Sequence, residues 1–208
     1  MTDRQALAEV VPRIEQCLRN DGGSGQVLII NNSGTGAYGV FPEPSINAIE
    51  GVMALNMDAP VALTAALLPL VRERGGAIVN IASTAAFQPT PYLGVYGATK
   101  AFLLHWSLAL NAELKGSRVR VLAVCPGPTR TGFFRAAGLA DSSVRGSVQD
   151  PDAVAAESLR ALALGRSLVV TGWPNKIGAV LAGLVPKRMV ASIAAVVLKS
   201  YRRQPDRG

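Results

Sequence analysis

A tyrosine and a lysine four residues apart are the residues of this sequence best suited to acid–base chemistry. In a helix, Tyr96 and Lys100 lie on one face, one turn apart. A free tyrosine, with a pKa of about 10, transfers protons poorly near neutral pH, and a neighbouring ammonium group is expected to lower that pKa. Ser83, thirteen residues before Tyr96, adds a hydroxyl group that can bind the same substrate oxygen. We therefore expect these three residues to move a proton to or from a carbonyl or alcohol oxygen.

Alternating apolar segments predict the elements that position these residues. Ser83 follows a short apolar run that predicts a buried strand over 77–82, and Tyr96 lies near the start of a helix predicted over about 94–115. Further strands are predicted over 27–30, 119–124 and 168–171, and further helices over 4–19, 46–73 and 151–164. This alternation indicates an α/β fold, a doubly wound parallel sheet in three αβα layers. Such sheets bind ligands at the carboxyl ends of their strands.

The composition fits one globular domain. The chain has 208 residues, of which 49% are hydrophobic and 17% charged, which excludes a largely disordered protein. Cys17 and Cys125 are expected to be buried thiols rather than a disulfide, and no cysteine or histidine spacing predicts a metal site. No signal peptide pattern is recognisable, so we expect a cytoplasmic protein.

The net charge of +7 is concentrated near the C-terminus. Residues 1–159 carry 12 Lys and Arg against 13 Asp and Glu, a net −1, whereas residues 160–208 carry nine against one, a net +8. The apolar segment 177–198 is interrupted by Pro186, and each arm is too short to cross a bilayer. We expect a helical hairpin that packs on the domain or on a second subunit; the alternative is peripheral membrane contact through 176–203. We expect no nucleic-acid binding, because few aromatic residues accompany these charges.

One glycine pattern is misleading. Residues 34–39 match the spacing of a dinucleotide-binding loop, Gly-x-Gly-x-x-Gly, after a predicted strand. That loop must open a helix whose N-terminus faces the pyrophosphate, but Pro42 and Pro44 follow instead. We expect no pyrophosphate site at this segment.

Motifs that follow one another along the chain resemble those of the short-chain dehydrogenase/reductase family. Residues 31–34, Asn-Asn-Ser-Gly, resemble the family's Asn-Asn-Ala-Gly motif, and residues 126–131 resemble its Pro-Gly-x-x-x-Thr segment. The positions that resemble the family's helix asparagine and its catalytic serine, tyrosine and lysine are Asn56, Ser83, Tyr96 and Lys100. The resemblance spans residues 1–172, the C-terminal portion of a Rossmann-type domain, and leaves 173–208 as a basic helical extension.

The resemblance implies an NAD(P)-dependent oxidoreductase that acts on a small carbonyl or alcohol substrate. Tyr96 is then the acid/base, Lys100 its partner, Ser83 the residue that binds the substrate oxygen, and Asn56 the residue that holds a relay water. The implied cofactor residues, for NAD or NADP, are Asn32, Gly34, Tyr96, Lys100, Pro126, Gly127, Thr129 and Thr131. Substrate contacts are expected in 132–150, with Phe133, Phe134 and Leu139 as candidates.

The sequence departs from the family at its beginning. The family's Thr-Gly-x-x-x-Gly-x-Gly loop, with the first strands around it, does not occur in these 208 residues. We expect a truncated form of a family enzyme; the alternatives are a natural short protein that lost cofactor binding, or a non-catalytic binding or scaffold protein. Missing strands predict an exposed sheet edge at 27–30, and such edges pair with other chains. We therefore expect a homo-oligomer.

Overall fold

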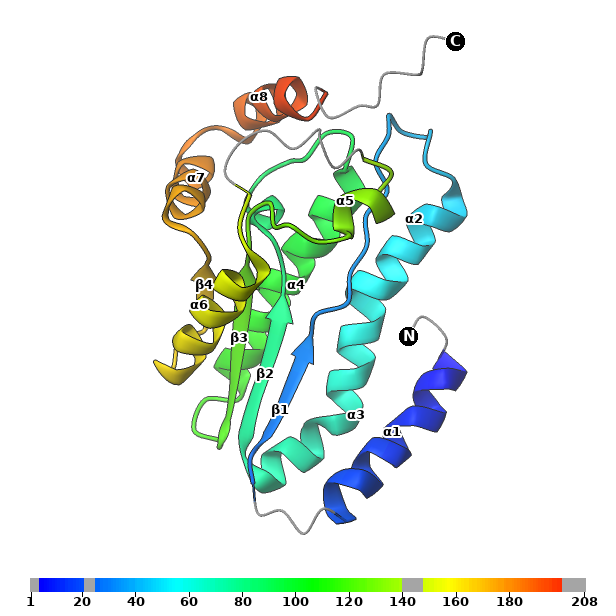
Figure 1. Ribbon diagram of the computed structural model, residues 1–208, viewed down its shortest axis with the longest axis vertical. Helices are drawn as coiled ribbons and strands as arrows, with labels where there is room; N and C mark the ends of the chain where they lie inside the picture. Colours follow the sequence, from blue (N-terminus) through cyan, green and yellow to red (C-terminus); the bar gives the residue numbers. More distant parts are fainter. Residues whose placement is uncertain (1–3, 21–24, 140–147, 200–208) are drawn as a thin grey trace.

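A parallel sheet occupies the centre of the protein (Figure 1). The computed structural model describes residues 4–20, 25–139 and 148–199. Within these ranges the sheet has the order β1–β2–β3–β4, formed by Val27–Asn31, Gly76–Ile81, Val119–Cys125 and Leu168–Val170. Each pair of neighbouring strands is parallel. The four predicted strands are thus confirmed, and their carboxyl ends share one edge of the sheet.

Helices cover both faces of this sheet. The helices are α1 (Arg4–Asn20), α2 (Ile46–Met53), α3 (Ala59–Arg74), α4 (Gly94–Glu113), α5 (Phe133–Ala136), α6 (Pro151–Ala163), α7 (Trp173–Leu184) and α8 (Lys187–Lys199). Ile78 and Val121 pack with α1, α3 and α4, whereas Val79 and Leu122 pack with Ala161 of α6. Because neighbouring residues of a strand face opposite sides, these contacts confirm the predicted doubly wound, three-layer arrangement.

The apolar helical stretch Ile46–Arg74 belongs to the core. By length and composition alone it passes as a membrane span, with a mean hydropathy of 1.5. In the structure, however, Leu67, Leu70 and Val71 are buried, and two of them, Leu67 and Val71, belong to the main core cluster. This stretch therefore belongs to the helical layer that covers one face of the sheet.

A buried chain of amide and hydroxyl groups joins the layers. Asn31 donates to the Asn80 side-chain oxygen at 2.7 Å and to the Thr64 hydroxyl at 3.2 Å. Asn80 in turn donates to the Ser107 hydroxyl at 2.8 Å. Asn80 and Ser107 are fully buried. Satisfied polar groups of this kind specify one packing arrangement, here between β1, β2, α3 and α4.

The two helices predicted at the C-terminus are present as α7 and α8, but they meet at their ends and do not pack side by side as the expected hairpin. The break falls at Val185 and Pro186. Two hydrogen bonds attach α8 to the domain: Lys187 Nζ donates to the Phe87 carbonyl at 2.8 Å, and the Tyr38 hydroxyl donates to the Leu198 carbonyl at 2.7 Å. α8 lies beyond the carboxyl edge of the sheet, and α7 lies at the side of the molecule next to β4 (Figure 1).

One edge of the sheet is open among the described residues. β1 pairs only with β2, and Leu28 and Ile30 of β1 are 45% and 52% exposed on the face that carries α6 further along. This confirms the predicted exposure of the strand. Assembly of a homo-oligomer through this edge stays a prediction.

Candidate active site

Tyr96, Lys100 and Ser83 meet at the carboxyl end of the sheet. Lys100 Nζ donates to the carbonyl of Ile81, the last residue of β2, at 2.8 Å. The same nitrogen lies 5.9 Å from the centre of the Tyr96 ring, and Tyr96 is hydrogen-bonded to the Ser83 side chain. Ser83 caps the short 3₁₀ helix η2 (Thr84–Phe87) that follows β2. The structure therefore brings the predicted catalytic groups together.

Burial governs the charge on Lys100. The side chain is only 4% exposed, and this desolvation lowers the pKa of Lys100 from 10.5 to about 8. A bond to one carbonyl leaves two of the three ammonium hydrogens for other acceptors. Lys100 is thus a buried hydrogen-bond donor near the tyrosine, and two of its ammonium hydrogens can bind further acceptors.

The pKa of Tyr96 moves in the direction opposite to the one expected. Burial raises the pKa of Tyr96 above 10.0, and the hydrogen bond with Ser83 offsets this only in part. The expectation that Lys100 lowers this pKa is therefore wrong for this structure. The physical reason is that burial penalises the charged phenolate; the Ser83 hydrogen bond lowers the pKa of Tyr96 only in part, and the buried Cys125 adds to the rise.

Cys125 lies next to Ser83, Tyr96 and Lys100. The sequence did not predict this proximity. Cys125 is the last residue of β3 and is fully buried. Its thiol accepts a hydrogen bond from the Ser83 backbone. Burial raises the pKa of Cys125 to about 12, although that bond and the charge of Lys100 both act to lower it. The sequence identified Cys125 only as a buried thiol, since nothing local predicts which side chains approach it.

Asn56 lies in an irregular turn that separates α2 from α3. Residues Ala54–Asp58 form a π-helical turn, closed by a hydrogen bond from the Ala59 N–H to the Ala54 carbonyl. The Asn56 side chain is 1% exposed; its Nδ2 donates to the Thr35 carbonyl and to the Thr99 hydroxyl, both at 2.9 Å. Its Oδ1 accepts from the Thr35 N–H at 3.0 Å.

This geometry changes the part that Asn56 can play. Both N–H groups of its side chain are engaged within the protein, so they cannot hold a relay water. Its main-chain carbonyl differs, because Pro60, four residues on, has no N–H with which to close the usual helical bond. The π-helical turn Ala54–Asp58 thus ends two residues before Pro60.

Gly34 lets the loop after β1 approach the lysine. A Cβ atom at this position would lie 3.0 Å from Lys100 Nζ and 3.3 Å from Asn56 Oδ1. The misleading glycine pattern at 34–39 opens no helix, as expected. Asn32 is exposed, and the structure describes no contact between its side chain and Tyr96 or Lys100.

Gln149 organises the segment after β3, and no sequence signal pointed to it. Its Oε1 accepts from the Gly127 N–H at 3.2 Å, the Thr171 hydroxyl at 2.8 Å and Asn175 Nδ2 at 3.2 Å. Within the segment, the Thr129 hydroxyl donates to the Gly127 carbonyl at 2.9 Å. Pro126 is partly buried and Thr131 exposed. Gln149 thereby ties this segment to β4 and α7.

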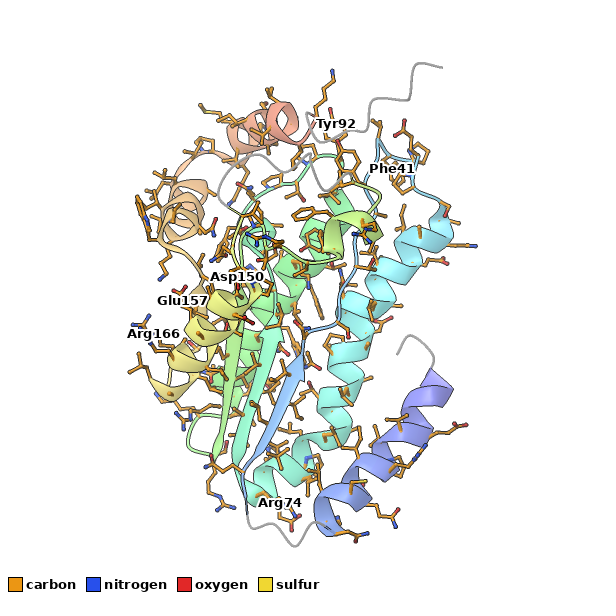
Figure 2. All side chains as sticks on the ribbon, in the orientation of Figure 1. Phe41, Arg74, Tyr92, Asp150, Glu157 and Arg166 are labelled. Carbon is orange, nitrogen blue, oxygen red and sulfur yellow. The ribbon has the colours of Figure 1, made fainter. Side chains whose placement is uncertain are left out.

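An apolar wall stands beside the tyrosine. Phe133 and Tyr96 have ring centres 4.9 Å apart, and Phe134 packs edge-on against Phe133 at 5.7 Å. Leu139 and Tyr38 belong to the same cluster, and Tyr92, at the same end of the molecule, packs on Tyr38 at 5.9 Å (Figure 2). The three predicted substrate residues therefore lie next to Tyr96; residues 140–147 of the predicted range lie outside the described residues.

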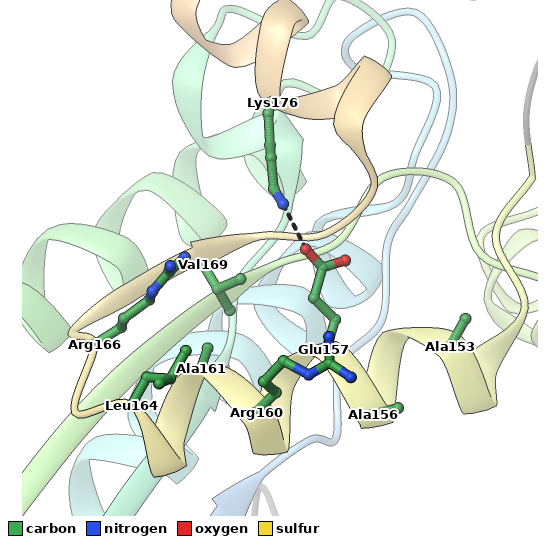
Figure 3. A pocket seen from close by; sticks show the side chains of 9 residues that line it. All are labelled: Ala153, Ala156, Glu157, Arg160, Ala161, Leu164, Arg166, Val169 and Lys176. Atoms are coloured by element: carbon green, nitrogen blue, oxygen red, sulfur yellow. Dashed lines mark hydrogen bonds and ion pairs between the residues drawn. The ribbon is translucent and has the colours of Figure 1, made fainter.

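A separate cavity of about 420 Å³ opens on the outer face of α6 (Figure 3). Lys176 of α7 reaches across it to the Glu157 carboxylate at 2.6 Å, and Arg160 and Arg166 line it. It shares no residue with the group around Tyr96. We therefore assign the chemistry to the tyrosine site.

Comparison with known proteins agrees with this geometry. The family model "short chain dehydrogenase" matches residues 1–141. The chain is 42% identical over 101 residues to ketoacyl reductase HetN of Nostoc sp., and 39% identical over 110 residues to serine 3-dehydrogenase of Rhizobium radiobacter; the matches cover 48% and 51% of this chain.

A solved short-chain dehydrogenase from Sphingobium yanoikuyae, in complex with NADPH, superposes with a TM-score of 0.74 at 32% identity over 100% of this chain. The chain spans 75% of that structure, and 35% and 43% of the two curated relatives. The family match, the shared fold and the Ser83–Tyr96–Lys100 group agree, and the chain belongs to the short-chain dehydrogenase family.

Proposed function

We propose that this chain carries the proton-transfer part of an NAD(P)-dependent oxidoreductase that reduces the carbonyl group of a small molecule. One observation carries the proposal: the Tyr96 hydroxyl, hydrogen-bonded to Ser83, stands next to the buried Lys100 at the carboxyl edge of the sheet. The NADPH complex of the Sphingobium yanoikuyae relative supports it.

Tyr96 acts as the acid in this proposal. Because burial raises the pKa of Tyr96, its hydroxyl stays protonated at neutral pH and can give a proton to a carbonyl oxygen. Ser83 Oγ accepts from the Ala85 N–H at 3.1 Å and its hydroxyl is hydrogen-bonded to Tyr96, so a substrate oxygen placed between the two hydroxyl groups would accept from both. Alcohol oxidation needs the phenolate, so we expect it to speed up as the pH rises.

Asn56 and Lys100 serve the proton supply. The Asn56 carbonyl, which Pro60 cannot bind, is the acceptor that suits a relay water. The spare hydrogens of the Lys100 ammonium group suit acceptors between that water and Tyr96.

The residues present fit the nicotinamide end of the cofactor. Lys100 is a buried cation whose remaining ammonium hydrogens suit ribose hydroxyl groups. Gly34 has no side chain, so a cofactor could approach its main chain beside Lys100. Pro126, Gly127, Thr129 and Thr131 would border the nicotinamide. NAD or NADP, when bound, supplies the hydride. No residue of this sequence matches the family's pyrophosphate loop, so we assign none to that role.

The test is carbonyl-dependent oxidation of NADH and NADPH by the 208-residue chain over a panel of ketones and aldehydes. Tyr96→Phe keeps the ring against Phe133 and is expected to lower the rate on the order of 10²–10⁴-fold. Tyr92→Phe is the matched control, because its hydroxyl has no assigned role, and should retain the rate. Turnover that survives Tyr96→Phe would overturn the proposal, as would no turnover on any substrate, which would favour the non-catalytic alternative.

A further inference from the structure

The last two helices turn their large apolar side chains outward. Of the 19 exposed large hydrophobic residues in the described part of the chain, nine lie in α7 and α8, which makes this region unlike the rest of the surface. We call this set the α7–α8 surface: Trp173, Ile177, Val180, Leu181, Leu184, Met189, Ile193, Val196 and Val197.

The inner faces of the same helices carry smaller residues. Ala182 in α7, and Val190 and Ala194 in α8, are the buried positions of the two helices. By contrast, Leu184 and Val196 are each 75% exposed. Within the described residues, packing on the domain therefore uses the small side chains, and the large side chains are exposed. The spacing of Ile177, Val180, Leu181 and Leu184 matches one helical face, so they form a continuous stripe.

Charge decides between the possible occupants of this surface. Residues 173–199 contain four cationic residues and no aspartate or glutamate; Lys176 is paired with Glu157 of α6, which leaves Lys187, Arg188 and Lys199 as the uncompensated charge. A second copy docking face to face would bring two sets of these charges together, which is unfavourable. An anionic lipid surface complements both features, since it accepts apolar side chains and attracts lysine and arginine.

The geometry of the pair suits the bilayer surface rather than its interior. α7 has 12 residues and α8 has 13, whereas a span needs about 20. Trp173, 71% exposed at the start of α7, is the residue type that prefers the headgroup region. The hydrogen bonds of Lys187 and Tyr38 described above hold α8 to the folded domain, and Asn175 and Lys176 hold the start of α7 through Gln149 and Glu157.

We propose that the α7–α8 surface docks on an anionic lipid bilayer. Its large apolar residues enter the headgroup boundary while Arg188, Lys199 and their basic neighbours bind lipid phosphates and carboxylates. The docked molecule would hold the carboxyl edge of its sheet, with Tyr96, towards the lipid. This proposal does not depend on the oxidoreductase function.

Vesicle co-sedimentation of the full chain tests the proposal. We expect binding to vesicles of phosphatidylcholine with phosphatidylserine, little binding to pure phosphatidylcholine, and weaker binding as salt is added. Arg188→Gln with Lys199→Gln should weaken binding roughly fivefold for each charge removed. Both side chains are exposed, so the fold should be unaffected.

The apolar contribution is tested by Leu184→Ser with Val196→Ser, which should lower binding at least tenfold. The matched control is Ile46→Ser with Leu159→Ser, two residues 63% and 54% exposed outside the α7–α8 surface, which should bind like the wild type. Full binding by the Leu184/Val196 variant would overturn the proposal. So would a stable dimer in the absence of lipid that this variant converts to a monomer, because a second copy would then cover the surface.

Discussion

The side-chain amide of Asn56 holds the main chain of Thr35 from both sides. Its Nδ2 donates to the Thr35 carbonyl at 2.9 Å, and its Oδ1 accepts from the Thr35 N–H at 3.0 Å. The second hydrogen of Nδ2 binds Thr99, one residue before Lys100. One buried amide therefore fixes the loop after β1 against the helix that carries the tyrosine and lysine.

Removal of this amide should destabilise the fold. Asn56→Ala leaves the Thr35 main-chain groups and the Thr99 hydroxyl without their partner, and should lower the free energy of unfolding by about 2–4 kcal/mol. Urea titration measures it. Asn47→Ala, an exposed asparagine on the same helical stretch, should stay within about 0.5 kcal/mol of the wild type. Equal effects of the two changes would contradict the role of Asn56.

Two glycine-to-alanine changes should shift the free energy of unfolding in opposite directions. Gly34→Ala brings a Cβ to 3.0 Å from Lys100 Nζ, and we expect it to displace the lysine and cost about 1–3 kcal/mol. Gly51→Ala, in α2, meets nothing within 4 Å and should stabilise the protein by about 0.5–1 kcal/mol. Thermal unfolding of both variants distinguishes them. A stabilising Gly34→Ala would show that the loop is not packed as described.

Lys100 should make stability depend on pH in the mildly alkaline range. Its pKa is lowered from 10.5 to about 8 in the folded state, so between these values the unfolded chain binds more protons and stability rises with pH. From pH 8 to pH 9 this contributes about 1 kcal/mol. Lys100→Met should remove that rise, whereas Lys115→Met, an exposed lysine, should retain it. Denaturant titrations at a series of pH values measure both.

The two thiols should differ in reactivity. Cys17 is exposed, so the expectation that both thiols are buried is wrong for Cys17. Cys125 is buried, with its pKa raised to about 12, and thiolates rather than thiols react. An aromatic disulfide reagent should therefore label Cys17 in the native protein and both residues in denaturant. Cys17→Ser should abolish the native labelling. Rapid native labelling of Cys125 would mean that the region beneath Tyr96 opens readily.

Most of the fold could be read from local patterns. The strands are continuous apolar runs because both faces of the sheet are covered, and such runs between helical segments stand out in a sequence. The irregular turn before Pro60 was less accessible: a proline indicates a bend, but whether the chain answers with a kink or a π-helical turn depends on what Asn56 must reach. Gln149 and Thr35 carried no signal, because their partners lie far away along the chain.

The sequence by itself determined the type and order of the elements. It also determined the residue types of the proposed proton-transfer site, with Ser83 at the end of one strand and Tyr96 and Lys100 along one helix. Only the tertiary structure decided how those groups behave. The expected fall in the pKa of Tyr96 became a rise, the Asn56 side chain became a clamp, and the large residues of α7 and α8 faced outward. The reason is the same in each case: burial and hydrogen-bond partners are set by segments distant along the chain, and desolvation then outweighs what near neighbours alone predict.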